Sequence, residues 1–160
     1  MASGDVHTFS VAIYNSWATG TNPIVWGTNT IKGGIVTNAT VPAVTTADPR
    51  WGAAGTTNFS TNEVTPGGAY SAGGISLTTP TVSNSTTLTN LNCTSPISLA
   101  ANASNPTGAY WMIVYDSTAT GKQAMGYIDL GGPLSLVSGL QINVNGASSG
   151  TQILFQGTAA

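Results

Sequence analysis

Charge is the property that this sequence has least of. Three Lys or Arg and five Asp or Glu residues make up 5% of its 160 residues, against about 25% in ordinary soluble domains. A tight nucleic-acid binder makes about 6–10 phosphate contacts through Lys and Arg, and docking to an anionic membrane also needs a basic cluster. The three cations of this chain are too few, so the sequence predicts no nucleic-acid partner and no membrane partner.

Cysteine and histidine are almost as scarce. Cys93 is the one cysteine, so no internal disulfide can form, and we expect it to be a small packed residue. His7 is the one histidine and falls near the N-terminus, where an exposed side chain is expected. The sequence holds no Cys or His cluster for zinc and no acidic loop for calcium. It therefore predicts no metal and no cofactor.

Long hydrophobic segments are also missing. The longest apolar run covers residues 110–115 and ends at Asp116, whereas a transmembrane helix needs about 20 apolar residues. Residues 1–5 lack the basic stretch and apolar core of a signal peptide. The sequence predicts neither a membrane segment nor a secretion signal.

Groups for catalysis are few. A Ser-His-acid mechanism needs a positioned base, and a terminal His7 is a poor candidate. Glycosidase chemistry needs two facing carboxylates, but Asp116 falls in a predicted turn and Asp129 at the end of a predicted strand. Aspartates in such places usually accept hydrogen bonds from the nearby backbone. The sequence therefore predicts no catalytic residues and a protein that is not an enzyme.

The residues that are abundant favour strands. Thr, Val, Ile, Tyr and Trp suit a pleated, half-buried surface, while strong helix formers are rare. With 41% hydrophobic residues and four tryptophans, the chain can bury a core. Short apolar runs between Gly, Pro, Asn and Ser clusters are typical of a sandwich or barrel. We predict one all-β or mainly β domain over residues 1–160, an antiparallel β-sandwich or jelly-roll-like fold with long loops.

The strand pattern is clearest in the C-terminal half. The continuous apolar run 110–115 predicts a strand buried on both faces, and a turn-rich segment links it to a second strand at 123–130 in a hairpin. Gly and Pro at 131–133 are expected to end that strand. Residues 140–144 alternate apolar and polar, which indicates one buried and one wet face. We expect these strands to form a meander, with 152–155 as a final strand or a docked tail.

The N-terminal part is less regular. Residues 1–25 are predicted to be an arm or a short helix, and we favour a helix over about 6–17 because four apolar residues there have helical spacing (Val6, Phe9, Ile13 and Trp17). The alternation of Phe9, Val11 and Ile13 would instead fit a strand. Trp26 and residues 31–37 are expected to form the first strand region. Residues 37–68 are rich in Pro, Gly, Ala and Thr and are predicted to be a long loop or arm.

Aromatic side chains are the candidate interface residues. Large aromatics anchor both cores and interfaces. Trp111 lies inside the apolar run and is expected in the core, whereas Trp51 lies in the long loop and is either a plug on the domain's own surface or an anchor on a partner. The candidate interface residues are Trp17, Trp26, Trp51 and Phe59.

Two segments resemble a known family. Residues 62–74 read Asn-Glu-Val-Thr-Pro-Gly-Gly-Ala-Tyr-Ser-Ala-Gly-Gly, and residues 126–131 read Gly-Tyr-Ile-Asp-Leu-Gly after a strand that ends in Tyr-Asp. Together they resemble signatures of small virion structural proteins of tailed bacteriophages, some of which are head decoration (cement) proteins. The resemblance covers residues 31–144, with Ala69 in place of the family's more frequent Gly and Leu130 in place of an aromatic residue.

The signature residues are expected to be structural. They are Glu63, Gly68, Tyr70, Gly73, Gly74, Tyr115, Asp116, Gly126, Tyr127 and Asp129. Gly67, Gly68, Gly73 and Gly74 would permit turns with positive φ. Tyr115 and Tyr127 would fill the core. The resemblance carries over no catalytic residue.

The resemblance implies a structural role in a virion. The expected protein sits on the capsid exterior, is assembled in the bacterial host cytoplasm, and contacts the major capsid protein and copies of itself, with a trimer expected. Low charge fits this role because it removes repulsion between neighbouring copies, and Thr- and Ser-rich strands can accept an added strand. One alternative is a phage tail or baseplate protein. Another is a carbohydrate-binding module, which requires at least two of Trp17, Trp26 and Trp51 to be exposed and coplanar.

Overall fold

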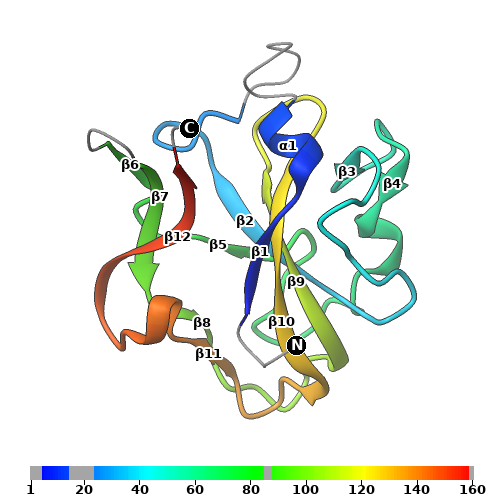
Figure 1. The fold of residues 1–160 in the computed structure, drawn as a ribbon. Coiled ribbons are helices and arrows are strands. Elements are labelled where there is room, and N and C mark those ends of the chain that lie inside the picture. The colour runs from blue at the N-terminus through cyan, green and yellow to red at the C-terminus, as the bar shows by residue number, and fades with distance from the viewer. Residues whose placement is uncertain (1–4, 15–23, 85–87, 159–160) are drawn as a thin grey trace.

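Strands dominate the structure. The computed structural model describes residues 5–14, 24–84 and 88–158, and within them the helices are α1 (Ser10–Tyr14) and two short 3-10 helices at Phe59–Asn62 and Val144–Gly146. The strands of these ranges pair antiparallel except in one short parallel pair. The prediction of a mainly β, antiparallel fold is confirmed (Figure 1).

A five-stranded antiparallel sheet occupies the centre of the molecule, in the order β1-β10-β9-β2-β5 (Figure 1). Its strands are β1 (Val6–Thr8), β2 (Ile31–Val36), β5 (Ile75–Ser76), β9 (Thr107–Asp116) and β10 (Ala124–Ser135). The middle strand β9 pairs with β10 on one side and with β2 on the other. The hairpin predicted around the apolar run is therefore confirmed.

A three-stranded antiparallel sheet, in the order β12-β7-β6, lies beside the central sheet. Its strands are β6 (Thr81–Asn84), β7 (Leu88–Ser95) and β12 (Gly150–Thr158). Two smaller pairs complete the fold, β8 (Ile97–Leu99) with β11 (Leu140–Ile142), and the parallel pair β3 (Pro49–Arg50) with β4 (Thr57–Asn58).

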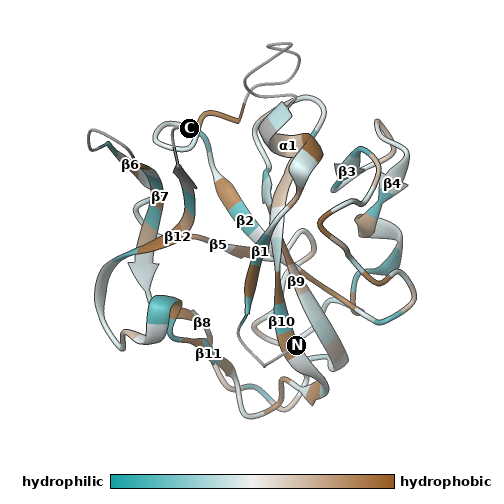
Figure 2. Cartoon of the chain, in the orientation of Figure 1, coloured by the Kyte–Doolittle hydropathy of each residue, from teal (hydrophilic) through white to brown (hydrophobic). Residues whose placement is uncertain are grey.

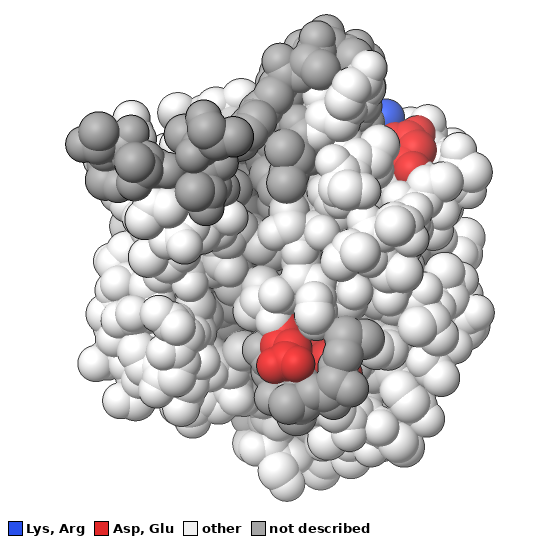
Figure 3. Space-filling model, in the orientation of Figure 1, with Lys and Arg blue, Asp and Glu red and all other residues white. Residues whose placement is uncertain are grey.

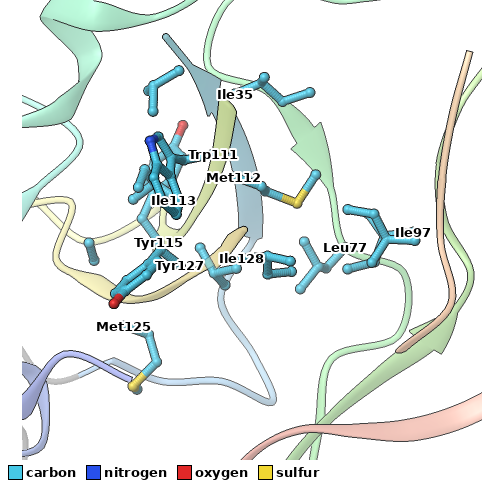
Figure 4. Close-up of a cluster of buried hydrophobic side chains, with 14 of the residues drawn as sticks. Ile35, Leu77, Ile97, Trp111, Met112, Ile113, Tyr115, Met125, Tyr127 and Ile128 are labelled. Atoms are coloured by element: carbon cyan, nitrogen blue, oxygen red, sulfur yellow. The ribbon is translucent and has the colours of Figure 1, made fainter. Parts of the chain in front are cut away.

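The core fills both sides of β9. Trp111 through Asp116 are all buried, as the continuous apolar run predicts. Figure 4 shows Trp111, Ile113 and Tyr115 on one side of the strand and Met112 on the other, towards Leu77. Colouring by hydropathy shows brown segments in the central strands and also in stretches of the loops that connect them (Figure 2).

Gly126 lets the two larger sheets approach closely. A methyl group at this position would lie 2.5 Å from the Phe155 ring of β12 and would clash with the carbonyl oxygen of His7 in β1. Trp26 packs edge-on against the same Phe155, with ring centroids 5.9 Å apart, and its indole N–H donates to the Asn92 carbonyl at 2.7 Å. The contact at Gly126 connects the three-stranded sheet to the central one, and Trp26 packs its loop onto the three-stranded sheet.

The segment 131–133 does not end the second hairpin strand, contrary to the sequence expectation. β10 continues to Ser135, and its register against β9 shifts between Asp129 and Leu134. Gly131 has a φ of +70°, and a methyl group on Gly132 would clash with the carbonyl oxygen of Ala109. The glycines therefore form a bulge, which bends the strand without ending it.

The expected C-terminal meander is also wrong. β11 pairs with β8, and β12 pairs with β7, so neither follows β10 as its neighbour. The alternation over 140–144 is confirmed, since Ile142 and Val144 are buried while Gln141 and Asn143 are exposed. Periodicity reports which side of a strand is buried, but not which strand it pairs with.

The N-terminal segment contains both a strand and a helix, the two structures that its apolar spacing allowed. Residues 6–8 form strand β1 on the edge of β10, and helix α1 follows over Ser10–Tyr14. Phe9 lies at the junction, fully buried, and its N–H donates to the Met125 carbonyl at 2.9 Å. The expected helix from residue 6 is wrong at its start because the free edge of β10 offers strand pairing there. Trp17 lies outside the described residues.

Candidate interaction surface

Three of the four candidate interface aromatics are core residues. The exposed fractions of Trp26, Trp51 and Phe59 are 2%, 4% and 0%, so none of the three is exposed to a partner as a candidate interface residue would be. Of the two alternatives left open for Trp51, burial agrees with the plug. Trp17, the fourth, lies outside the described residues. Each of the three buried rings packs on another aromatic ring of the chain itself, which removes it from solvent.

Trp51 is a plug on the domain's own surface. Its ring stacks on Tyr115 of β9, with centroids 4.9 Å apart and planes inclined by 12°. It also lies on Gly34 of β2, where any side chain would clash with the indole. The buried residues Phe59 and Val64 follow it in the same loop. The segment 37–68, predicted to be a long loop or arm, contains β3, β4 and the 3-10 helix at Phe59–Asn62 between its loop stretches. The side chains of Trp51, Phe59 and Val64 pack it onto the central sheet.

Glu63 accepts hydrogen bonds from other residues of the first signature segment. Its Oε1 accepts a hydrogen bond from the Tyr70 hydroxyl at 2.9 Å and another from the Gly73 N–H at 2.7 Å. The Tyr70 hydroxyl in turn accepts from the N–H of Ile35 in β2 at 2.8 Å. These contacts, called here the Glu63 network, attach residues 63–73 to β2 of the central sheet.

The two signature segments meet at Tyr115. Its hydroxyl donates to the Gly73 carbonyl at 2.7 Å. Burial raises the pKa of Tyr70 and of Tyr115 well above the ordinary tyrosine value, and the nearby Glu63 carboxylate raises both further. Both hydroxyls are therefore neutral hydrogen-bonding groups, and neither is available as a base at ordinary pH.

The glycines of the first segment shape its turns. Gly68, Gly73 and Gly74 have φ values of +61°, +84° and +90°, as expected. Gly67 does not have a positive φ, and its backbone instead exchanges two hydrogen bonds of 3.0 Å with Tyr70. The residues of the first signature segment therefore form a turn that brings the Tyr70 hydroxyl to the Glu63 carboxylate.

The aspartates of the second signature bond to the backbone close to them, as predicted. Asp116 is fully buried, and its Oδ1 accepts from the N–H groups of Thr118 and Ala119 at 2.9 and 3.1 Å. Asp129 accepts from the Gly131 N–H at 2.8 Å. Tyr127 lies beside Asp129 and is 2% exposed, so it fills the core as expected. Both carboxylates are used in shaping turns.

His7 and Cys93 are both packed against other residues. His7 is half-buried and stacks on Tyr127 with centroids 4.9 Å apart, so the expected exposed side chain is wrong, because β1 pairs with β10 directly at Tyr127. Cys93 is fully buried, as predicted, and burial raises the pKa of its thiol to about 11. In the ranges that the structure describes, no group of three or more His, Cys, Asp and Glu side chains could hold a metal ion.

A shallow cavity of about 270 Å³ opens between β10 and β11. Its lining is Asp129, Leu130, Leu134, Leu140, Gln141, Ile142 and Asn143. Asp129 is the one charged residue among these lining residues, and its Oδ1 already accepts from Gly131. The cavity offers no pair of titratable groups for acid–base chemistry.

The surface in Figure 3 carries few charged atoms: the face shown is almost entirely uncharged. The guanidinium of Arg50 is buried and pairs with Asp48 at 3.0 Å. Large apolar side chains are exposed at Tyr14, Val25, Val41, Val44, Val82 and Val137. Val82 is distinctive because it lies on β6, an outer strand of the three-stranded sheet.

The fold and this surface define the class of protein, a mainly β, antiparallel protein with a neutral exterior. No protein-family model, curated protein or solved structure matches the chain. None of the helices in the described ranges is long and apolar enough to cross a membrane.

Proposed function

We propose that this protein is a non-enzymatic structural protein of a tailed-phage virion, most specifically a decoration protein that stabilises the head lattice. Its partners are the major capsid protein and other copies of itself. It sits on the capsid exterior and is assembled in the host cytoplasm.

The observation that carries the proposal is the contact between the two signature segments. Glu63, Tyr70 and Gly73 form one hydrogen-bonded network, and Tyr115 joins it from a strand 42 residues further along the chain. Residues that resemble one family in two separate segments thus belong to a single structural unit. A chance resemblance in either segment would not require this contact.

The neutral surface supports the same role. A lattice protein is surrounded by many identical copies, and like-charge repulsion between them would weaken the assembly. With a formal net charge of −2 over 160 residues, this repulsion is small. Attachment would then rest on apolar burial and on hydrogen bonds between uncharged groups.

The test compares virions with and without the protein. Mass spectrometry of purified particles of the encoding phage is expected to detect the chain, and electron microscopy is expected to show density on the head that disappears when the gene is deleted. Particles lacking the protein are expected to release DNA at lower temperature. Density on the tail or baseplate would support the tail alternative, and absence of the chain from particles would refute both.

The carbohydrate-binding alternative does not meet its own requirement. It needs two exposed, coplanar tryptophans among Trp17, Trp26 and Trp51, but Trp26 and Trp51 are 2% and 4% exposed. These two rings pack on Phe155 and Tyr115. We therefore do not propose it.

A further inference from the structure

Strand β6 (Thr81–Asn84) forms an outer edge of the three-stranded sheet. In the described part of the chain it pairs with β7 on one side and has no strand on the other, and Figure 1 shows it at the margin of the molecule. Every second residue of an edge strand directs its N–H and C=O groups away from the sheet. β6 therefore offers backbone groups to an incoming strand.

β6 lacks several of the features that protect such an edge. Natural edge strands are blunted by short length, by Lys or Pro, by bulges, or by a covering loop; β6 is short, and Pro80 precedes it. β6 reads Thr-Val-Ser-Asn, without charge or proline, and pairs with β7 without a shift in register. Val82, Ser83 and Asn84 are exposed. Within the strand itself, no charge, proline or bulge opposes pairing with another strand, and its short length limits how many residues can pair.

An apolar row crosses the sheet and ends exposed on β6. Val82 pairs with Leu91 on β7, and Leu91 pairs with Phe155 on β12, so the three side chains share one face. Phe155 is 5% exposed, Leu91 is partly buried, and Val82 is 52% exposed. The row thus runs from the core to the open edge.

The opposite face of the sheet carries a polar row. Ser83, Asn90 and Gln156 are aligned across the three strands. The Gln156 amide donates to Asn90 Oδ1 at 2.9 Å, and the Asn92 amide donates to Ser83 Oγ at 3.0 Å. A strand added at β6 must therefore be apolar on one face and polar on the other, which is the pattern of β6 itself.

We propose that the β6 edge pairs antiparallel with β6 of a second copy of this chain, about a twofold axis at Val82. This register places Val82 opposite Val82 of the second copy and Thr81 opposite its Ser83. The apolar row continues without a break into the second sheet. A shift of one residue would reverse the faces and place Val82 opposite a polar side chain, so the apolar row selects the register.

The contact predicts a weak dimer. In this register Thr81, Val82 and Ser83 lie opposite residues of the second β6, and Asn84 lies opposite Pro80, which has no N–H to donate. Pairing of three residues from each copy gives a small interface, and interfaces below about 1,200 Å² are usually weak and transient. A twofold contact closes on itself, so it predicts a dimer in place of the trimer expected from the sequence. The inference concerns the isolated chain and does not rest on the proposed capsid role.

The first experiment is disulfide trapping with the full chain. V82C is expected to form a disulfide-linked dimer on oxidation, because directly opposed residues have Cβ atoms about 4.5–5.5 Å apart, close to disulfide geometry. Cys93 does not compete, since it is fully buried. V41C is the matched control, because Val41 is 57% exposed but lies outside β6, and it is expected to remain monomeric.

The second experiment is sedimentation velocity over a range of concentrations. The average mass of the unmodified protein is expected to rise with concentration, V82K to remain at the mass of one chain, and V41K to behave like the unmodified protein. Circular dichroism verifies that both variants fold. The inference is overturned if V82C cross-links no more than V41C, or if V82K associates as the unmodified protein does. Either result would leave the virion test unaffected.

Discussion

At the scale of single residues, Glu63 stabilises the turn of the first signature segment through hydrogen bonds within that segment. Its carboxylate accepts from the Tyr70 hydroxyl and from the Gly73 N–H. Tyr70 is 2% exposed, so water cannot replace a lost acceptor at its hydroxyl. A buried donor without an acceptor costs more than the hydrogen bond contributes when it is made.

Replacing Glu63 by Ala is therefore expected to destabilise the fold by about 1–3 kcal/mol. The measurement is urea unfolding monitored by tryptophan fluorescence. E63Q is the matched control: it keeps an acceptor oxygen at Oε1 and is expected to lose less. Equal unfolding midpoints for E63A and the unmodified protein would contradict the role assigned to this carboxylate.

The two buried tyrosines predict a pH dependence of stability. Because the folded state raises the pKa of Tyr70 and Tyr115 above the value of about 10 in the unfolded chain, the folded state retains protons that the unfolded state loses. The contribution of these two tyrosines to the free energy of unfolding is fully present below pH 10. As pH rises above about 10, ionisation of each tyrosine in the unfolded state is expected to lower the free energy of unfolding by about 1.4 kcal/mol per pH unit, until the folded-state pKa of that tyrosine is reached.

This dependence is measured by urea unfolding between pH 8 and about 11. Y70F and Y115F are each expected to flatten the decline in the free energy of unfolding. Y14F is the matched control because Tyr14 is 61% exposed, and it is expected to retain the full slope. A decline of the same steepness in Y70F and Y115F would show that these hydroxyls are not its cause.

At the scale of elements, the closeness of the two larger sheets depends on Gly126. β10 at this position lies against the Phe155 ring and the His7 carbonyl. An added methyl group has no space there, so β1 and β12 would both have to move. The cost of overpacking is commonly about 1–3 kcal/mol.

G126A is therefore expected to lower the free energy of unfolding by about 1–3 kcal/mol. Thermal unfolding by circular dichroism measures it. G27A is the control, because a methyl group on Gly27 would meet nothing within 4 Å, and it is expected to unfold close to the unmodified temperature. Equal melting temperatures for G126A and G27A would mean that β10 and β12 separate easily.

At the scale of the whole molecule, the scarcity of charge determines how the proposed attachment should respond to salt. Salt screens interactions between exposed charges and has little direct effect on apolar contacts. Attachment to capsids is therefore expected to change by less than about threefold between roughly 50 and 500 mM NaCl. Sedimentation of capsids with bound protein measures this. A collapse of binding across that range would show that ion pairs hold the protein in place.

How far the sequence predicts this structure differs between its parts. The hairpin of β9 and β10, the burial of Cys93 and the turn roles of Asp116 and Asp129 follow from local patterns, and the structure confirms them. The burial of Trp51 could not be predicted, because it depends on contacts of its ring with Gly34 and Tyr115, which lie far from it in the sequence. A glycine pair inside an apolar strand is the one signal that an aromatic ring lies close to the backbone there.

The few charged residues and the abundance of strand-forming ones were enough, by themselves, to establish the mainly β class. These properties can be counted along the sequence, because β-branched and aromatic residues are enriched in strands as a class. Only the tertiary structure decided that β12 pairs with β7, that Trp26 and Phe59 face inward, and that β6 is an outer strand among the residues the structure describes. The physical reason is that strand pairing joins segments far apart in the chain, and the choice of partner rests on the packing of the whole core.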